Sequence, residues 1–579
     1  VNLGVILTER KQFDKVAQVY RRYIDIAPEN MEAYLNLGSV LQVQGKHAGA
    51  EIMFMRVLAV DQMNLSAHQG LAASLRAQNK ISEAISCFQK ILKIDAKQAD
   101  AHLAIGEMQQ AGNNFTDAIY NFEQALTIDP RSARAWNNKG LALQFQKKAN
   151  QAVECYRQAL AIDPQFVSAH NNLGNTFQDL ARFQDAIASY RQTLRIDPNN
   201  SDAYNNLGSA YEAMKDYDQA LDHYQQALKI APTQTNALLN IGSIYQREMR
   251  LDEAKTYFDA ALAIDANYVD ALWNRAIVSL LSGNFAEGWR GYEYRWTRRN
   301  APPKPEFNQP FWSGDADLSD KTILLYSEQG VGDTIQFVRY IDRILALGAD
   351  IVLAVQPALK TLFTPSPRVN VITQIDSNLP PFDFQCPLAS LPLAFKTDLT
   401  NIPAANSCLA VAPDRIRYWA DKFSDYALPR IGIVWSGNPT HANDHNRSMR
   451  LETLSALWKR TDCGFFSLQK EVREIDIQTM RDATAIVDLS SDMSDYTETA
   501  AIIANLDLVI SVDTSVAHLA GAMGAKVWVL LPFSPDFRWL TERSDSPWYP
   551  SMRLFRQPAI DDWTSVLDEV VSSLDSMQH

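Results

Sequence analysis

Small and apolar residues recur in the first half of the chain with a period of 34 residues. A glycine or alanine opens each period, an alanine usually follows twelve residues later, and an aromatic residue stands sixteen residues after the opening. The opening residues are Gly4, Gly38, Ala72, Gly106, Gly140, Gly174, Gly208, Gly242 and Ala276. This spacing predicts pairs of antiparallel helices that approach closely at the small residues, with the aromatic residue filling the groove between one pair and the next. Prolines such as Pro130 and Pro164 would end the second helix of a pair, because proline lacks an N–H.

The period resembles the tetratricopeptide repeat, and the resemblance covers roughly residues 1–295. It implies an α-helical superhelix whose concave groove is lined by the first helix of each unit. Gly4 lies too near Val1 for a complete first helix, so we expect the first repeat to be truncated. The last unit keeps the register but has Gly288 in place of the alanine, and we interpret it as the closing repeat.

An asparagine stands two residues before most of the opening residues. The row is Asn2, Asn36, Asn138, Asn172, Asn206, Asn240 and Asn274, and it is interrupted by Gly70 and Ala104. An asparagine side chain offers both donors and an acceptor, so a row on a concave face could bind the backbone of an extended peptide. The row resembles the asparagine ladder of the O-linked N-acetylglucosamine transferases. That resemblance implies that Asn138, Asn172, Asn206, Asn240 and Asn274 bind an acceptor polypeptide. The alternative is that the asparagines only stabilise the repeat scaffold.

The second half begins where prolines cluster, in RRNAPPKPEFNQPFWSGDADLSD, so residues 296–319 are predicted to form a linker. Short apolar runs then alternate with helical patterns, as in KTILLYSEQGVGDTIQFVRYIDRILALGADIVLAV. Such alternation predicts a parallel sheet. A second series begins at PRIGIVWSGNP and continues through GFFSLQ, AIVDLS, LDLVISVDT and KVWVLLP. We therefore expect two Rossmann-like domains, residues 320–427 and 428–579, with ligands at the carboxyl ends of the strands.

The segment VDTSVAHLAGAMG is the strongest candidate for a binding turn. Asp513 follows a predicted strand, and Thr514 and Ser515 open a helix. The free N–H groups and the dipole at that end of a helix favour an anion. His518 lies one turn further along. These four residues are expected to form a diphosphate cradle.

Two other turns offer further candidates. The WSGNP segment places Ser436 and Asn438 directly after a strand, where both can donate hydrogen bonds. Arg447 stands just ahead of a predicted helix, where a cation could hold a phosphate; a solvated arginine is the alternative. Asp333 follows Gly332 at the start of a helix, and a capping aspartate would explain it equally well.

Residues 320–579 resemble the GT-B glycosyltransferases of family nine, the heptosyltransferase group. The resemblance implies that Asp333 is the catalytic base and that Arg447 stands where the family has a phosphate-binding lysine. It also implies that Asp513 to Ser515 and His518 hold the donor diphosphate, although the family often has glycine in place of Ser515. Arg447, His518 and the helix dipole would then meet the charge of the leaving group. Glu328 is the nearest other carboxylate that could serve as the base.

Composition narrows the possible partners. The chain has 579 residues, a formal net charge of −13 and a pI of about 5.3, which argues against a general nucleic-acid binder. No run of about 18 apolar residues predicts a membrane span. The five cysteines are scattered, which suits a reducing compartment, so we expect a cytoplasmic protein. The pair Asp315 and Asp317 has the spacing of a metal-binding motif but precedes the first strand, so neither a metal nor a cofactor is expected.

The combination of repeats with a GT-B unit resembles bacterial protein glycosyltransferases, including those proposed to modify flagellin. We therefore expect a protein O-glycosyltransferase that moves a sugar from a nucleotide sugar to Ser or Thr in an inverting, metal-independent reaction. Two alternatives remain open at this point. One is transfer to a glycolipid or polysaccharide with the repeats as a docking platform, and the other is a non-catalytic scaffold.

Overall fold

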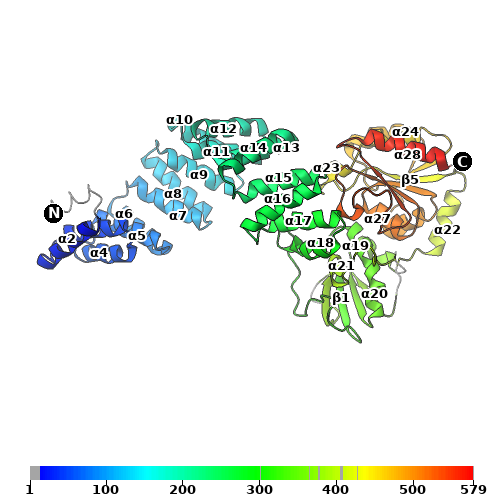
Figure 1. Cartoon of the computed structure of the whole chain (residues 1–579), viewed down its shortest axis with the longest axis horizontal. Coiled ribbons are helices and arrows are strands. Elements are labelled where there is room, and N and C mark those ends of the chain that lie inside the picture. Colours follow the sequence, from blue (N-terminus) through cyan, green and yellow to red (C-terminus); the bar gives the residue numbers. More distant parts are fainter. Residues whose placement is uncertain are drawn as a thin grey trace. The chain divides into compact units, whose positions relative to one another are not determined.

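A computed structural model describes residues 13–299, 301–363, 366–373, 375, 379–404, 409–426, 428–441 and 443–577 (Figure 1). Asn2, Gly4 and Cys408, on which the sequence carries predictions, lie outside these described residues. The chain divides into two compact units, Val1–Pro232 and Thr233–His579. Across the described ranges, no helix is both long and apolar enough to cross a membrane.

The first unit is built of helices alone over its described residues, 13–232. The helices are α2 (Phe13–Ile26), α3 (Met31–Val43), α4 (His47–Val60), α5 (Leu65–Ala77), α6 (Ile81–Ile94), α7 (Ala99–Ala111), α8 (Phe115–Ile128), α9 (Ala133–Phe145), α10 (Ala149–Ile162), α11 (Val167–Asp179), α12 (Phe183–Ile196), α13 (Ser201–Ala213) and α14 (Tyr217–Ile230). From α3 onward, 13-residue and 14-residue helices alternate, as in α3 and α4. This is the succession of paired helices that the 34-residue period predicts.

The small residues and the aromatic residues of the period meet in the structure. A side chain at Gly174 would come within 2.4 Å of the ring of Tyr190, and one at Gly208 within 2.7 Å of Tyr224. The ring of Phe54 lies against Gly38 of its own hairpin and also against Gly70 of the next helix. The ring of Phe54 therefore packs between its own hairpin and the next helix. The close approach of the ring at position 70 also explains why glycine interrupts the asparagine row there.

Each hairpin turn carries one residue in the left-handed backbone region, and these residues recur at the same spacing of 34. They are Gly45, Asn79, Asn113, Lys147, Ala181, Lys215, Met249 and Gly283. Only the first and the last are glycine, the residue that adopts this conformation without steric cost. The closed turn of the repeat therefore stabilises a conformation that most of these residues disfavour.

The second unit begins with four more repeat helices, α15 (Thr235–Arg247), α16 (Leu251–Ile264), α17 (Val269–Leu281) and α18 (Phe285–Tyr292), followed by the short helix η1 (Glu293–Trp296). Leu280, Phe285 and Trp289 of these helices are buried in the same apolar core as Ile323 and Trp548 of the sheet region. The last repeats and the sheets therefore share one core. The compact units do not divide where the repeat pattern ends.

The first sheet has four parallel strands in the order β3-β2-β1-β4. The strands are β1 (Thr322–Tyr326), β2 (Asp350–Ala354), β3 (Val369–Ile372) and β4 (Phe384–Pro387). Its helical elements are α19 (Val331–Phe337), η2 (Val338–Tyr340), α20 (Ile341–Ala346), η3 (Pro357–Leu362), η4 (Leu388–Ser390) and α21 (Leu391–Ala394). The next helix, α22 (Pro413–Lys422), packs against α26 (Tyr496–Ile503) of the second sheet region. The segment predicted as a linker packs beside β4, where the backbone N–H of buried Trp312 donates to the Gln385 carbonyl at 2.9 Å. Asp315 and Asp317 are exposed.

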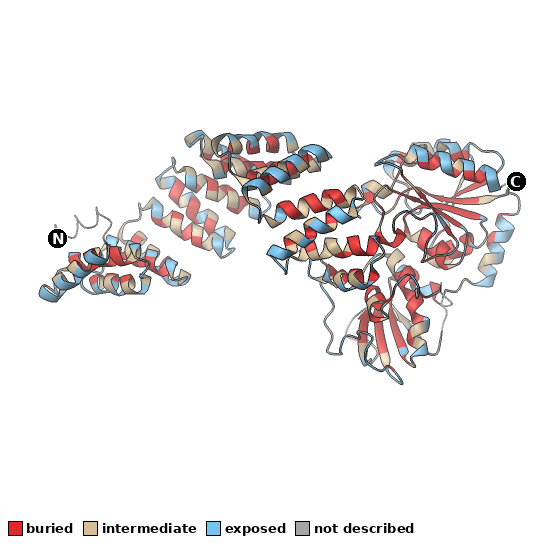
Figure 2. Ribbon diagram, in the orientation of Figure 1, coloured by how far each residue is buried: buried red, intermediate tan, exposed pale blue. Residues whose placement is uncertain are grey.

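The second sheet has six parallel strands in the order β10-β9-β8-β5-β6-β7. The strands are β5 (Arg430–Val434), β6 (Gly464–Ser467), β7 (Ile486–Asp488), β8 (Leu508–Val512), β9 (Val527–Leu531) and β10 (Met552–Arg556). Its helical elements are α23 (Asp444–Arg447), η5 (Leu451–Leu454), α24 (Ser455–Trp458), α25 (Glu474–Asp482), α26 (Tyr496–Ile503), α27 (Ser515–Ala522), η6 (Phe537–Trp539) and α28 (Trp563–Met577). Figure 2 shows the strands of the second sheet as buried, which agrees with their nearly continuous apolar sequences. The strand order is that of the doubly wound nucleotide-binding fold, and it reverses between β5 and β8.

Candidate functional site

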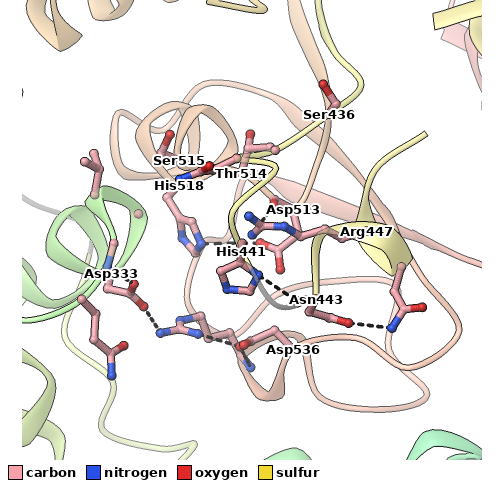
Figure 3. Close-up of a pocket in the computed structure, with 18 of the residues that line it drawn as sticks. Asp333, Ser436, His441, Asn443, Arg447, Asp513, Thr514, Ser515, His518 and Asp536 are labelled. Carbon is pink, nitrogen blue, oxygen red and sulfur yellow. Dashed lines mark hydrogen bonds and ion pairs between the residues drawn. The ribbon is translucent and has the colours of Figure 1, made fainter. Parts of the chain in front are cut away.

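One large cavity in the second unit lies at the carboxyl ends of strands from both sheets. It has a volume of about 1560 Å³ and is lined from three directions: by α15 and α17 of the last repeats, by the turn after β1, and by the turns after β5, β6, β8 and β9. The β5 and β8 turns flank the point where the strand order reverses, which is where ligands bind in folds of this kind. Most predicted site residues of the sheet region line this cavity (Figure 3).

The turn after β8 leads directly into the N-terminus of α27. Thr514 is the N-cap residue, and its side chain makes no capping bond to any described N–H. Its hydroxyl lies 3.0 Å from Ser511 Oγ instead, and Ser515 Oγ lies 2.7 Å from the Tyr496 hydroxyl. The first N–H groups of α27 therefore stay available at the cavity, where the helix dipole favours an anion.

The turn after β5 adds a buried hydroxyl to the same region. Ser436 is 2% exposed, and its backbone N–H donates to Gln469 Oε1 at 3.2 Å. Its Oγ is buried and has no hydrogen-bond partner among the residues that the structure describes. A buried hydroxyl without a partner is costly, so a ligand that accepts from Ser436 would remove this cost.

Arg447 lies at the end of the short helix α23, whereas the sequence pattern placed it just ahead of a helix. Its Nη1 donates to the carbonyl of Asp513 at 3.1 Å, which links the β5 loop to the β8 turn. A side chain at Gly437 would come within 2.8 Å of the guanidinium, so a larger residue there would displace the head group of Arg447. The Nε of Arg447 is buried and finds no acceptor within the described part of the chain. The guanidinium of Arg447 is therefore held at the cavity with its Nε–H available to a ligand.

Three polar side chains, of which Asp444 is buried, fix the shape of the β5 loop. Arg473 donates to Asp444 at 2.6 Å and to the carbonyl of Gly437 at 3.0 Å. Ser448 Oγ donates to Asp444 at 2.7 Å and accepts from the Gly437 N–H at 2.9 Å. The loop that carries Arg447 is thus positioned by an ion pair and its hydrogen bonds.

Asn438 organises this loop through its side-chain and backbone oxygens. Its Oδ1 accepts from the N–H and the hydroxyl of Thr440, at 3.0 and 2.9 Å, and its carbonyl accepts from the N–H of His441 at 3.1 Å. His441, which the sequence reasoning passed over, lines the cavity. Its position between two predicted site residues on one strand-end loop was the signal that could have identified it.

His518 does not carry the charge that the sequence reasoning gave it. Burial and the nearby Arg538, Arg339 and Arg447 lower the pKa of His518 well below its ordinary value, so the imidazole is neutral at pH 7. Its Nδ1 lies 2.9 Å from the Tyr549 hydroxyl. The expectation that His518 neutralises a diphosphate is therefore corrected: an uncharged ring can offer only a hydrogen bond.

Asp513 is a second buried titratable group in the cavity. Burial, followed by the neighbouring carboxylate of Asp536, raises the pKa of Asp513 to about 6. One of its oxygens lies 3.7 Å from His518 Nε2. A carboxylate that titrates this close to neutrality suits contact with hydroxyl groups better than contact with phosphate oxygens.

Asp333 stands at the start of α19 with both carboxylate oxygens engaged. Oδ2 accepts the N–H of Gly330 at 2.8 Å, which is the capping role that the sequence left open. Oδ1 forms an ion pair with Arg538 of η6. A side chain at Gly332 would lie 2.8 Å from the ring of His518, so α19 and α27 meet closely here. Arg538 could have been anticipated, because PFSPDFRW follows β9 at the same edge of the sheet.

Glu328 lies outside the cavity lining. It accepts from Arg295 Nη2 at 3.0 Å and from the N–H of Ala389 at 3.3 Å, and its side chain is 6% exposed. Burial raises the pKa of Glu328 to about 7. The group joins the last repeat to the first sheet.

The asparagines of the repeats form hydrogen bonds between neighbouring repeats. In the first unit, Asn172 Nδ2 donates to Asn137 at 3.1 Å and Asn206 Nδ2 donates to Asn171 at 3.3 Å. Asn138 Nδ2 donates to Glu107 at 3.0 Å. These bonds favour the scaffold interpretation for part of each side chain.

In the second unit, Asn274 donates to Ser243 Oγ at 3.2 Å and also lines the cavity. It thus lies in the same cavity as Asp333 and Arg447. Asn240 belongs to α15 but is not among the lining residues.

Comparison with known protein families identifies the repeats. Models described as tetratricopeptide repeat match residues 70–133, 165–233 and 211–274, and a TPR repeat model matches residues 145–180. The chain therefore contains tetratricopeptide repeats, and its C-terminal region is an α/β unit of parallel sheets.

Individual proteins resemble parts of the chain. Protein FlbA of Caulobacter vibrioides (strain ATCC 19089 / CIP 103742 / CB 15) is 27% identical over 328 residues, which covers 52% of this chain and 54% of the relative. The chain thus spans about half the length of this curated relative. Among solved structures, MamA is 25% identical and covers 28% of this chain and 94% of its own, with a TM-score of 0.27. The Cut9–Hcn1 hetero-tetramer of the APC/C is 20% identical and covers 46% and 52%, with a TM-score of 0.36.

Proposed function

We propose that this protein is a nucleotide-sugar-dependent glycosyltransferase of the GT-B type that modifies Ser or Thr of a polypeptide held by its repeats. The observation that carries the proposal is the single cavity in which a repeat asparagine, Asn274, lies together with the strand-end turns of two parallel sheets. Ordinary ligand pockets measure about 300–1,000 Å³. A cavity of about 1560 Å³ suits two substrates, a nucleotide sugar and an acceptor side chain.

The donor diphosphate would lie at the point where the second sheet reverses its strand order. The free N–H groups of α27, the buried hydroxyl of Ser436 and the guanidinium of Arg447 converge there. Two of these three observations concern polar atoms without partners among the described residues, which a bound phosphate would satisfy. Arg447 and the helix dipole then offset the charge of the leaving group, so the reaction needs no metal.

The acceptor hydroxyl would attack the anomeric carbon from the side of the first sheet. Its oxygen forms the new glycosidic bond, the bond from the anomeric carbon to the diphosphate breaks, and the nucleoside diphosphate leaves. The proton of the hydroxyl passes to the carboxylate of Asp333, which lines the cavity. The ion pair with Arg538 orients this carboxylate. Inversion at the anomeric carbon follows from this single displacement.

Flagellin is one candidate acceptor, and the cytoplasm, where nucleotide sugars are available, is the proposed site of action. The test is to coexpress the chain with candidate acceptor proteins and to measure their intact masses. A mass increase of one sugar, absent with Arg447→Ala and unchanged by a chelator, supports the proposal. Hydrolysis of a nucleotide sugar without any modified protein would favour a glycolipid or polysaccharide acceptor. Failure to bind any nucleotide sugar would favour the scaffold alternative.

A further inference from the structure

His441 lies on the β5 loop and lines the cavity, and the proposed mechanism gives it no role. The loop is held in place on both sides of the ring: the His441 N–H donates to the carbonyl of Asn438 at 3.1 Å, and the His441 carbonyl accepts from the N–H of Asp444 at 2.9 Å. Asp444 is itself fixed by its ion pair with Arg473. Figure 3 draws the ring in the middle of the cluster that includes Arg447 and Asp333.

The hydrogen bonds of the ring select one tautomer. The backbone N–H of Asn443 donates to His441 Nδ1 at 3.2 Å. Nδ1 must therefore be unprotonated, because a proton there would face the N–H. In the neutral ring the single proton then lies on Nε2. The described residues give Nε2 no hydrogen-bond partner, so it remains an available donor at the cavity.

Four charged groups from three parts of the fold surround the ring. Arg447 of the same loop faces it as a cation, and Asp444 of that loop, Asp333 of α19 and Asp536 beside η6 face it as carboxylates. Burial and Arg447 lower the pKa of His441 below its ordinary value, against the opposite effect of the three carboxylates. The ring is therefore uncharged at neutral pH.

We propose that His441 binds the leaving diphosphate of the donor by donating a hydrogen bond from Nε2–H, as a neutral imidazole fixed in one tautomer by the Asn443 N–H. This inference rests on the proposed function and assigns a further ligand-binding residue to its donor site. Because Nε2 already carries the proton and Nδ1 accepts the Asn443 N–H, His441 has no free lone pair to take the proton of the acceptor hydroxyl. It therefore serves as a hydrogen-bond donor and leaves proton transfer to a carboxylate.

A neutral His441 ring suits this position better than a charged one. Arg447 already supplies a cation to the same cavity, and a second charge beside it would have to be desolvated in the absence of ligand. A neutral donor contributes a hydrogen bond to the anion without that cost. Hydrogen bonds to charged groups are also stronger than those between neutral partners.

The experiment uses the full chain and inorganic pyrophosphate as a probe that does not depend on the base, together with UDP, GDP, ADP and CDP, all by titration calorimetry. His441→Phe keeps the ring shape but removes the donor, and we expect pyrophosphate to bind about 10- to 100-fold more weakly. His441→Gln places an amide donor near the position of Nε2 and should remain within about threefold of the wild type. His445→Phe, on the same loop but not in the cavity lining, is the matched control and should change nothing.

The pH dependence separates a neutral donor from a cation. The ratio of wild-type to His441→Phe affinity cancels the ionisation of pyrophosphate itself, and it should stay constant from pH 7 to 8.5. A ratio that falls steadily with rising pH would overturn the proposal, since it would show that the protonated ring binds. Equal binding by wild type and His441→Phe would also overturn it. Absence of binding to the wild type by every probe would instead remove the proposed function, so the two failures are distinguishable.

Discussion

The contacts that stabilise the repeats of the first unit and those that form the cavity of the second unit span very different distances along the chain. In the first unit, Asn172 bonds to Asn137 and Asn206 to Asn171, and each pair is 35 residues apart. In the cavity, Arg538 pairs with a carboxylate 205 residues away. A contact of the first kind recurs in the next repeat and leaves a periodic trace in the sequence. A contact of the second kind occurs once and leaves none.

The two regions also use polar side chains differently. The repeat asparagines mostly complete one another's hydrogen bonds, which stabilises the stack. The cavity instead keeps polar atoms incompletely paired within the described residues, such as Ser436 Oγ and Arg447 Nε. Such unpaired buried groups cost stability and are expected where a ligand completes them. The difference predicts that substitutions in the cavity change binding and rate, whereas substitutions in the first unit change stability.

The largest expected effect tests this separation at Asp333. Asp333→Asn should keep the bond to the Gly330 N–H, because the amide oxygen of asparagine can also accept it, although the ion pair with Arg538 is lost. Loss of a general base typically costs about 10²–10⁴ in rate, so transfer should fall by that factor while pyrophosphate affinity stays within about twofold. The measurement is the initial rate of sugar transfer beside titration calorimetry. Near-normal transfer by the folded variant would leave Asp333 with the capping role alone.

The second effect concerns binding rather than rate. Arg447→Ala removes the only cation that the proposed diphosphate site takes from the β5 loop, and hydrogen bonds to charged groups contribute about 1.5–3 kcal/mol. Pyrophosphate should therefore bind about 10- to 100-fold more weakly. Arg450→Ala, an exposed arginine three residues further along that is not in the cavity lining, is the control. Equal losses in both variants would mean a general charge effect and no defined site.

The sequence predicted the regular parts of both regions better than the irregular ones. The apolar runs identified β1, β2 and β5 to β9, and all of these strands except β7 are buried for most of their length. They did not identify β3, which is only partly buried, or β4 and β10, which are mostly buried. Polar residues interrupt the short sequences of β4 and β10 at Gln385 and Arg553, so their apolar signal is weak.

The candidate site was predicted in location but not in chemistry. Thr514, Ser436 and Arg447 could be placed at one edge of a sheet because parallel strands end there together. The neutral state of His518 could not be predicted, since it depends on burial and on Arg538 and Arg339, which are distant in sequence. The ion pair of Asp333 with Arg538 was likewise invisible before the fold brought the two elements together.

A third prediction uses the pH dependence of stability at Asp513. Because its pKa is raised to about 6 in the fold, and is near 4 in an unfolded chain, the folded state binds the extra proton between these values. Its contribution to stability is therefore lost as the pH rises from about 4 through 6. Asp513→Asn removes that loss and should raise the free energy of unfolding at pH 8 by about 1–3 kcal/mol.

Tryptophan fluorescence is the suitable probe for this variant, since Trp136 is the only one of the twelve tryptophans that precedes residue 233. Urea unfolding at pH 5 and at pH 8 gives the comparison. If the wild type and Asp513→Asn show the same change between the two pH values, the carboxyl group does not titrate as described. The same result would weaken the assignment of Asp513 to hydroxyl contacts.

A fourth prediction tests the boundary between scaffold and binding in the asparagine row. Replacing Asn172, Asn206 and Asn240 together by Ala removes hydrogen bonds that contribute about 0.5–1.5 kcal/mol each. We expect weaker acceptor binding, lower stability of the repeats, and unchanged pyrophosphate affinity. The bonds of Asn172 and Asn206 to other repeats make a stability measurement essential beside the binding measurement. A variant that loses stability but binds its acceptor normally would assign the row to the scaffold.

The smallest expected effect lies in a hairpin turn of the first unit and has a definite sign. Ala181 has a φ of 55°, a left-handed conformation that costs an alanine roughly 1–2 kcal/mol. Glycine avoids that cost but gains freedom in the unfolded chain, which costs about 0.4–1 kcal/mol. Ala181→Gly should therefore stabilise the repeats by about 0.5–1 kcal/mol, measured by the loss of helical circular dichroism in urea. The same substitution at Ala188, exposed in the interior of α12, should destabilise them by about 1 kcal/mol. The opposite signs of two identical substitutions seven residues apart isolate the backbone effect, and a loss of stability at both positions would show that the turn does not require its left-handed residue.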